Sequence, residues 1–184
     1  RGRACGVIRQ GTGWVAAAGL VATNAHVVAG QGDLQALIPG QGPSRDAQPV
    51  YVDAAADVAL VRVDGMGAAP LPLGDAPRRP EAVVMLGYPG GGPLRAEAAT
   101  AAPPRTVLAP DAYGDGVSPR SVVVPRGSLG PGSSGGPVLD AGGEVVGMIF
   151  GGSEDGGAGA AVPPGPLRRA LAAPPPPAAP RPCA

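Results

Sequence analysis

Residues 131–140 read PGSSGGPVLD, and this stretch directs the interpretation of the whole chain. Its first seven positions hold three glycines, two prolines and two adjacent serines, and an apolar run follows directly. One interpretation is an ordinary tight turn, because glycine and proline are typical turn residues. The other is a loop that holds the Ser134 hydroxyl toward a substrate, since glycine lets the backbone approach a ligand or another segment closely. The composition of the loop alone leaves both interpretations open.

The pattern on either side of this loop favours an all-β protein. Short apolar runs alternate with glycine and proline, a spacing typical of antiparallel sandwiches and barrels; examples are DVALVRV (57–63), EAVVMLG (81–87), SVVVP (121–125) and EVVGMIFG (144–151). The proline-rich stretch 67–80 interrupts this rhythm. We therefore predict two β halves, residues 1–80 and 81–162. A final segment, 163–184, is expected to hold a short helix over 163–173 and a proline-rich end.

The composition excludes several classes of protein. Fourteen arginines, with no lysine, balance fourteen acidic residues, so we expect no nucleic-acid partner. No run of 18 apolar residues occurs, so any membrane contact is expected only through a segment upstream of Arg1. No metal-ligand spacing or cofactor motif is present, and we predict neither a metal nor a cofactor. Cys5 and Cys183 could be free thiols, but their positions favour a disulfide that closes nearly the whole chain, in an oxidising compartment.

Three residues could carry hydrolytic chemistry. His26 is the only imidazole of the chain, and Asp57 opens an apolar run that reads as a buried strand. Taken singly, His26 could be structural and Asp57 could be a solvated turn residue. Together with Ser134 they supply a base, an acid to orient it and a nucleophile, which could meet in a cleft between the two halves. The backbone N–H groups of Gly132 and Ser134 would then form an oxyanion hole.

With these three motifs the chain resembles the chymotrypsin-like serine proteases over about residues 11–162. The corresponding stretches are TNAHVV (23–28), DVALV (57–61) and GSSGGPV (132–138). The GTGWV stretch at 11–15 resembles the bacterial Deg-type members. More narrowly, VVMLGYPGGG (83–92), YGDG (113–116) and the two flanking cysteines resemble the membrane-anchored periplasmic serine proteases of actinobacteria that are linked to acid and oxidative stress resistance.

This resemblance implies two six-stranded antiparallel β-barrels, with the active site in the cleft between them and a short C-terminal helix. It implies a serine endopeptidase that hydrolyses polypeptides through an acyl-enzyme intermediate, without a cofactor. It also implies a location outside the cytoplasm, either tethered at the periplasmic face of the membrane or secreted, and a role in envelope stress.

The resemblance further implies a pocket for the substrate side chain. Ser128 would form its floor, Gly151 and Gly159 its walls, and Phe150 would lie alongside. Because the floor carries no acid, we expect a medium apolar residue such as leucine rather than lysine or arginine. Residues 149–151 would pair with the substrate as an added strand. Ile149 stands where these enzymes usually have a serine that hydrogen-bonds the catalytic acid, so Asp57 is expected to use backbone N–H groups near His26 instead.

An alternative of a different class is a protease-shaped binding or sensing module whose catalysis is locked. The presence of all three catalytic residue types favours the enzyme.

Overall fold

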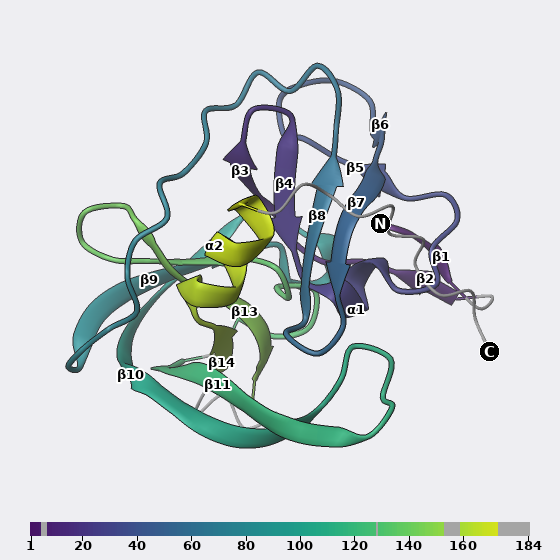
Figure 1. Cartoon of the computed structure of the whole chain (residues 1–184). Coiled ribbons are helices and arrows are strands. Elements are labelled where there is room, and N and C mark those ends of the chain that lie inside the picture. The colour runs from purple at the N-terminus through teal and green to yellow at the C-terminus, as the bar shows by residue number, and fades with distance from the viewer. Residues whose placement is uncertain (5–6, 128, 153–158, 173–184) are drawn as a thin grey trace.

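The computed structural model describes residues 1–4, 7–127, 129–152 and 159–172 (Figure 1). Strands make up most of the ordered elements, which confirms the all-β prediction. The strands are β1 (Gly2–Ala4), β2 (Val7–Arg9), β3 (Trp14–Ala17), β4 (Leu20–Thr23), β5 (Gln35–Ala36), β6 (Arg45–Asp46), β7 (Gln48–Asp53), β8 (Val58–Arg62), β9 (Glu81–Gly87), β10 (Arg95–Pro110), β11 (Val117–Arg126), β12 (Pro137–Leu139), β13 (Val145–Gly152) and β14 (Gly159–Val162). The helices are α1 (Ala25–Val28), the 3-10 turn η1 (Pro89–Gly91) and α2 (Pro164–Ala172), the last within the predicted range 163–173.

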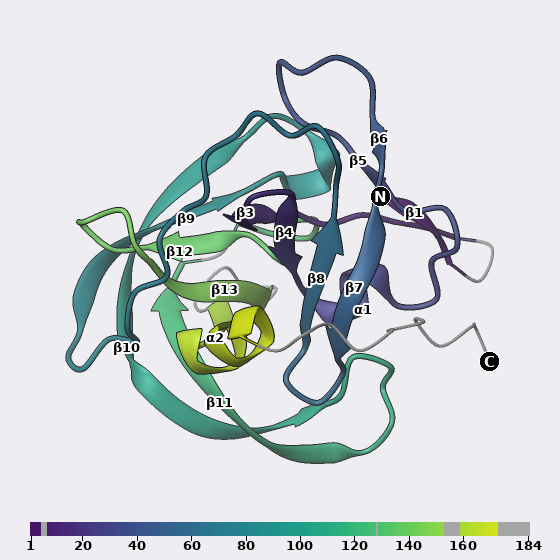
Figure 2. The ribbon, with the colours of Figure 1, turned by 45° about the horizontal axis from the view of Figure 1, so that its top comes forward.

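The C-terminal half forms a closed antiparallel barrel. Six strands follow the order β10-β11-β14-β13-β12-β9 around it. Strand β10 is long enough to pair with β9 over its first part and with β11 over its second. As Figures 1 and 2 show, the β10–β11 hairpin continues beyond the barrel and curves beneath the strands of the other half. At its tip the Ala112 N–H donates to the Ala54 carbonyl oxygen at 3.0 Å, so the hairpin is docked on the turn that precedes β8.

The N-terminal half departs from the expected ring of six strands. Among its described residues, β3-β4-β8-β7 form a four-stranded sheet, and β1–β2 and β5–β6 form separate pairs. Strands β5 and β6 have two residues each, because the glycine and proline residues at 39–43 interrupt pairing between them. Pro49, which has no N–H to donate, lies in β7 at the edge of the sheet. In the part of the chain that the structure describes, the strands of the C-terminal half are the ones that close into a ring.

One hydrophobic cluster joins the two halves. It contains Trp14, Ala22, Val58, Leu60, Val145, Met148, Val162, Leu167 and Ala170. Helix α2 contacts both β8 and β13, so it covers the junction between the N-terminal sheet and the barrel. Strand β8 is buried over Val58–Val61, as its unbroken apolar run predicts. Strands β1 to β8 and strands β9 to β14 thus belong to separate sheets but share this part of the core.

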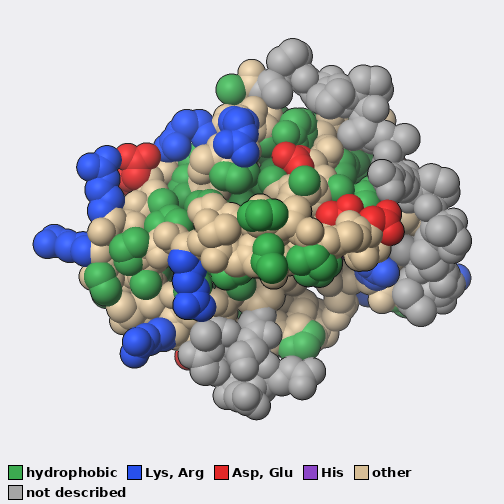
Figure 3. All heavy atoms as spheres, turned by 60° about the horizontal axis from the view of Figure 1, so that its bottom comes forward, with side chains coloured by type: hydrophobic (Ala, Val, Ile, Leu, Met, Phe, Trp, Pro, Cys, Tyr) green, Lys and Arg blue, Asp and Glu red, His purple; other side chains and the backbone are tan. Residues whose placement is uncertain are grey.

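The hairpin exposes one apolar face to solvent. Leu108 and Pro110 of β10 pair with Pro119 and Val117 of β11, and alternation along the strands places all four side chains on the same face. All four residues are exposed. Figure 3 shows apolar side chains across the side of the molecule where the hairpin lies. On the opposite face of the hairpin, Ala109 and Arg120 are buried.

Among the described residues, neither α-helix combines the length and the apolar character that a membrane span needs.

Replacing Leu167 by alanine should destabilise the fold by about 2–5 kcal/mol, because this fully buried side chain would leave a cavity in the cluster shared by both halves. Denaturant unfolding followed by Trp14 fluorescence measures the change. Leu37→Ala is the matched control, since Leu37 is 68% exposed and its loss should cost less than about 0.5 kcal/mol. Equal destabilisation by the two variants would contradict this account of the core.

Candidate functional site

The imidazole of His26 faces the Asp57 carboxylate. His26 lies on α1, the short helix that follows β4, and Asp57 directly precedes β8. The His26 Nδ1 atom lies 2.8 Å from Asp57 Oδ2, and the His26 backbone N–H donates to Asp57 Oδ1 at 3.0 Å. Both carboxylate oxygens therefore contact the same residue. With Nδ1 donating to the carboxylate, the other ring nitrogen, Nε2, is the one that can accept a proton.

Asp57 occupies a buried and conformationally unusual position. The residue is 2% exposed, which contradicts the reading of Asp57 as a solvated turn residue. Its φ of 57° makes it the one non-glycine residue with positive φ in the described part of the chain. Aspartate tolerates this left-handed region better than most residues, and such strain concentrates at functional sites. The Asn24 side chain holds the turn by donating Nδ2–H to the Asp57 carbonyl oxygen at 2.9 Å.

The Ser134 loop is held between two backbone segments. A β-carbon at Gly135 would collide with the carbonyl oxygen of Thr12, and one at Gly136 would collide with that of Leu86. Gly135 also has a φ of 89°, which other residues rarely adopt. These glycines therefore allow the loop to pass closely between the N-terminal sheet and β9, which excludes an ordinary surface turn as its explanation.

Thr12 is the main contact between this loop and the N-terminal half. Its N–H donates to the Ser134 carbonyl oxygen at 2.7 Å, and its hydroxyl donates to the Gly132 carbonyl oxygen at 2.9 Å. The same hydroxyl accepts the Tyr88 N–H at 3.0 Å, and the Thr23 hydroxyl donates to the Thr12 carbonyl oxygen at 2.7 Å. Sequence reasoning missed this role, although the glycines on either side of Thr12 mark a tight passage of the backbone.

A second contact places Ser134 and His26 at the same junction. A β-carbon at Gly11 would lie 2.6 Å from Val27 Cγ2 and 2.9 Å from the Ser134 carbonyl oxygen. Gly11 therefore separates the Ser134 backbone from the residue that follows His26. No hydrogen bond joins the His26 and Ser134 side chains in the described part of the chain. Such bonds are often formed only in the substrate complex.

Arg120 is a further charged residue at the site that sequence reasoning missed. Its NH1 atom lies 3.9 Å from Asp57 Oδ2, and its side chain is buried. NH2 donates to the Pro110 carbonyl oxygen at 2.8 Å, and the guanidinium carbon lies 5.3 Å from the centre of the Phe150 ring. The residue reaches Asp57 from β11 of the other half, and nothing in its sequence neighbourhood marks that contact.

The residues expected to bind substrate are only partly brought together. Ser128 lies outside the described residues. Ile149 packs in the core of the C-terminal barrel, its N–H donates to the Gly136 carbonyl oxygen, and its carbonyl oxygen accepts the Gly135 N–H. The Ile149 N–H is therefore not free for substrate, and pairing of Ile149 with substrate stays a prediction that would use the second lone pair of its carbonyl oxygen. Gly151 has open space where a side chain would lie, whereas Gly159 packs against Pro125 and Gly127.

The structure contains a backbone donor to Asp57 of the kind that the sequence led us to expect. The backbone N–H of His26 contacts the carboxylate, as the absence of a serine at Ile149 led us to expect. The predicted disulfide cannot be placed, since Cys5 and Cys183 both lie outside the described residues. Within the described ranges no three His, Cys, Asp or Glu side chains form a group that could hold a metal ion.

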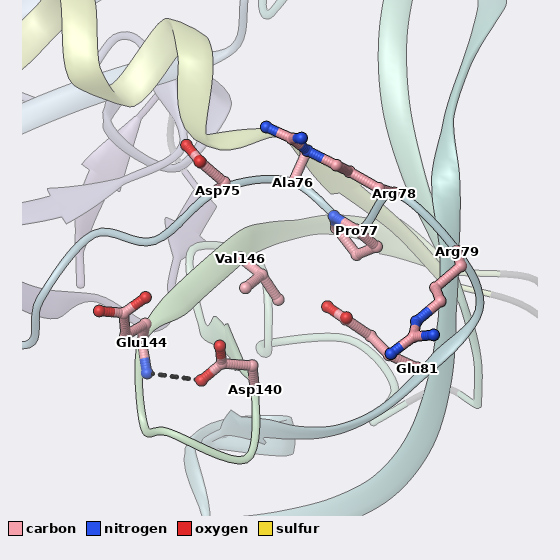
Figure 4. A pocket seen from close by; sticks show the side chains of 9 residues that line it. All are labelled: Asp75, Ala76, Pro77, Arg78, Arg79, Glu81, Asp140, Glu144 and Val146. Carbon is pink, nitrogen blue, oxygen red and sulfur yellow. Dashed lines mark hydrogen bonds between the residues drawn. The ribbon is translucent and has the colours of Figure 1, made fainter.

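A separate pocket contains none of the predicted site residues. Figure 4 shows it between the 75–79 connection, the start of β9 and the turn before β13. Asp75, Glu81, Asp140 and Glu144 line it together with Arg78 and Arg79. The Asp140 carboxylate accepts the backbone N–H groups of its own turn, including that of Glu144 at 2.9 Å.

Comparison with known proteins agrees with this arrangement. Serine protease Rv3671c of Mycobacterium tuberculosis is 38% identical over 153 residues, which cover 82% of this chain and 38% of that protein. Serine protease HTRA1A of Danio rerio is 34% identical over 145 residues, which cover 77% of this chain and 30% of that protein. The chain thus spans well under half the length of these curated relatives.

Solved structures show the same fold. The crystal structure of the Rv3671c protease in its active form has a TM-score of 0.85 at 33% identity and covers 98% of this chain and 78% of that one. The inactive form of that protease has a TM-score of 0.76 at 34% identity, covering 88% and 82%. Residues 11–148, well over half of the chain, match the trypsin-like peptidase domain. The chain therefore belongs to the trypsin-like peptidase family.

Proposed function

We propose that this chain is a serine endopeptidase whose catalytic residues are His26, Asp57 and Ser134. The observation that carries the proposal is the two-point contact between His26 and the buried Asp57 carboxylate. This contact fixes the orientation of the imidazole and provides an anion beside the ring when it becomes protonated. Membership of the trypsin-like peptidase family supports the same assignment.

The proposed reaction proceeds in two halves. His26 Nε2 takes the proton of the Ser134 hydroxyl while Oγ forms a bond to the peptide carbonyl carbon, and the carbonyl electron pair moves to oxygen. The tetrahedral intermediate collapses, the C–N bond breaks, and the leaving amine takes the proton from His26. Water then attacks the acyl-enzyme with His26 again acting as base, which releases the second product and restores Ser134.

The backbone around Gly132 supports the proposed oxyanion hole. The Gly90 N–H donates to the Pro131 carbonyl oxygen at 2.8 Å, which fixes the plane of the peptide between Pro131 and Gly132. In a trans peptide the N–H points away from the carbonyl, so the Gly132 N–H is directed away from Gly90. The Gly136 N–H donates to the Ser133 carbonyl oxygen at 2.9 Å, which in the same way fixes the peptide between Ser133 and Ser134 and with it the direction of the Ser134 N–H. These bonds orient the donors before substrate binds, which is what electrostatic stabilisation of an oxyanion requires.

Substrate recognition is proposed at the end of β13. Ile149 is the last residue of β13 whose backbone is bonded to the Ser134 loop. Phe150 and Gly151 follow it, and the space beside Gly151 is open. An extended polypeptide could pair with this segment through its main chain. With Ser128 as a neutral floor, we propose a preference for a medium apolar side chain such as leucine at the cleaved bond.

The proposed setting is outside the cytoplasm, in the response to envelope stress. Its support is the similarity to the Rv3671c protease together with the two cysteines, which would pair in an oxidising compartment. Any membrane tether would lie upstream of this chain.

Ser134→Ala should lower peptide hydrolysis by about 10⁴- to 10⁶-fold while the melting temperature stays within a few degrees. The assay is turnover of a peptide library, followed by the best fluorogenic peptide from it. Ser118→Ala, at an exposed position on β11, is the control and should retain activity.

Labelling by a fluorophosphonate at Ser134 in the unsubstituted protein would support the enzyme, whereas no labelling under oxidising or reducing conditions would favour the locked binding module. More than a tenth of the activity left in Ser134→Ala would overturn the assignment.

Thr12→Val should lower kcat by about tenfold to a hundredfold, because the buried hydroxyl bonds to Gly132 and Tyr88 are lost and the Ser134 loop shifts. Thr12→Ser keeps the hydroxyl and should recover part of that loss. The exposed Thr106→Val is the matched control. Steady-state kinetics and thermal unfolding of the three variants separate the loop effect from global instability. A normal kcat in Thr12→Val would show that the hydroxyl does not position the loop.

A further inference from the structure

Arg120 brings a second cation to the Asp57 carboxylate. Its guanidinium NH1 lies 3.9 Å from Asp57 Oδ2, the oxygen that also faces His26 Nδ1. The Arg120 and Asp57 side chains are 7% and 3% exposed, so water screens this pair far less than an ion pair at the surface. In the described part of the chain, His26 and Arg120 supply the ion-pair contacts of Asp57. A buried guanidinium needs a counter-charge, and among the described residues Asp57 is the carboxylate with which Arg120 forms an ion pair.

Three contacts hold Arg120 in this place. NH2 donates to the Pro110 carbonyl oxygen at 2.8 Å across the hairpin, and the guanidinium lies over the Phe150 ring at a distance typical of a cation–π contact. The hairpin itself is docked by the Ala112 N–H on the Ala54 carbonyl oxygen, three residues before Asp57. Nε is buried and finds no hydrogen-bond partner among the described residues, so this arrangement is unfavourable for stability taken alone.

The Asp57 carboxylate needs the contact with Arg120 on its Oδ2 side. Oδ1 accepts the backbone N–H of His26, which is fixed by α1. Oδ2 is contacted by the His26 ring and the Arg120 guanidinium, and the ring is the group that the carboxylate is meant to orient. Without Arg120, rotation of the carboxylate would be restrained on Oδ2 only by the ring itself.

We propose that Arg120 is a positioning residue for Asp57, linking the catalytic acid of the N-terminal half to the barrel that carries Ser134. This inference rests on the proposed function, since it presumes that Asp57 orients His26 for catalysis. Arg120 contacts neither the nucleophile nor the base directly. Its effect should therefore pass through Asp57 and appear in kcat rather than in KM.

A double-substitution cycle tests this coupling. Arg120→Met keeps the aliphatic stem but removes the charge and the hydrogen bond, and it is combined with Asp57→Asn. An activated peptide ester serves as substrate, so that the low activity of Asp57→Asn, expected to be about 10⁴-fold down, stays measurable. Arg126→Met is the matched control, because Arg126 is an exposed arginine at the end of the same strand.

We expect Arg120→Met to lower kcat by about tenfold to a hundredfold, with KM changed by less than about threefold. In the Asp57→Asn background the same substitution should lower kcat by less than about twofold, because its target is already lost. Arg120→Lys keeps the charge and should recover part of the loss, while Arg126→Met should behave as the unsubstituted protein. Melting temperatures of all variants accompany the kinetics.

Two outcomes would overturn the inference while leaving the proposed function intact. One is an equal loss of kcat from Arg120→Met in both backgrounds, and the other is a loss confined to KM. If Arg120→Met does not fold, the cycle with Arg120→Lys decides the question in the same way, since its loss of kcat should also disappear in the Asp57→Asn background. Normal activity in Asp57→Asn alone would instead overturn the proposed triad.

Discussion

The burial of one carboxylate, that of Asp57, is the constraint on which the site depends. An anion removed from water must be compensated by charges and hydrogen bonds close to it. Here the compensation comes from two sides: His26 of the N-terminal half and Arg120 of the C-terminal hairpin. The contacts that compensate the buried charge therefore also link the two halves, and the same contacts orient the imidazole.

The Ser134 loop is positioned by a different kind of constraint, close backbone packing. Gly135 and Gly136 pass so near to carbonyl oxygens on either side that no side chain could replace their hydrogens. Thr12 then binds the loop through its N–H and its hydroxyl. Apart from the Thr12 hydroxyl, these contacts involve main-chain atoms, so the fold itself sets most of the loop geometry. This rigidity suits the proposed site, which has to present a hydroxyl and two N–H donors in fixed directions.

The two halves make unequal contributions to this site. The closed barrel supplies the Ser134 loop, the β13 segment and the hairpin that carries Arg120. The more open N-terminal sheet supplies His26, Asp57 and Thr12. The shared cluster under α2 keeps the two sets in register, since it contains side chains from both β8 and β13.

The sequence by itself determined the all-β class, the C-terminal helix and the three candidate residues, because alternation, turn residues and short motifs are local properties. It also indicated that backbone N–H groups near His26 would serve Asp57. Only the tertiary structure decided the contacts of Thr12 and Arg120, and the bonding of Ile149 to the Ser134 loop. The bonds of Thr12 to the Ser134 loop and the contact of Arg120 with Asp57 join residues more than 60 positions apart, and the Ile149 bonds join β13 to a separate loop, so no local pattern records these pairings. The sequence did not predict the open N-terminal sheet for the same reason, since closure of a ring depends on whether two edge strands far apart in the sequence pair with each other.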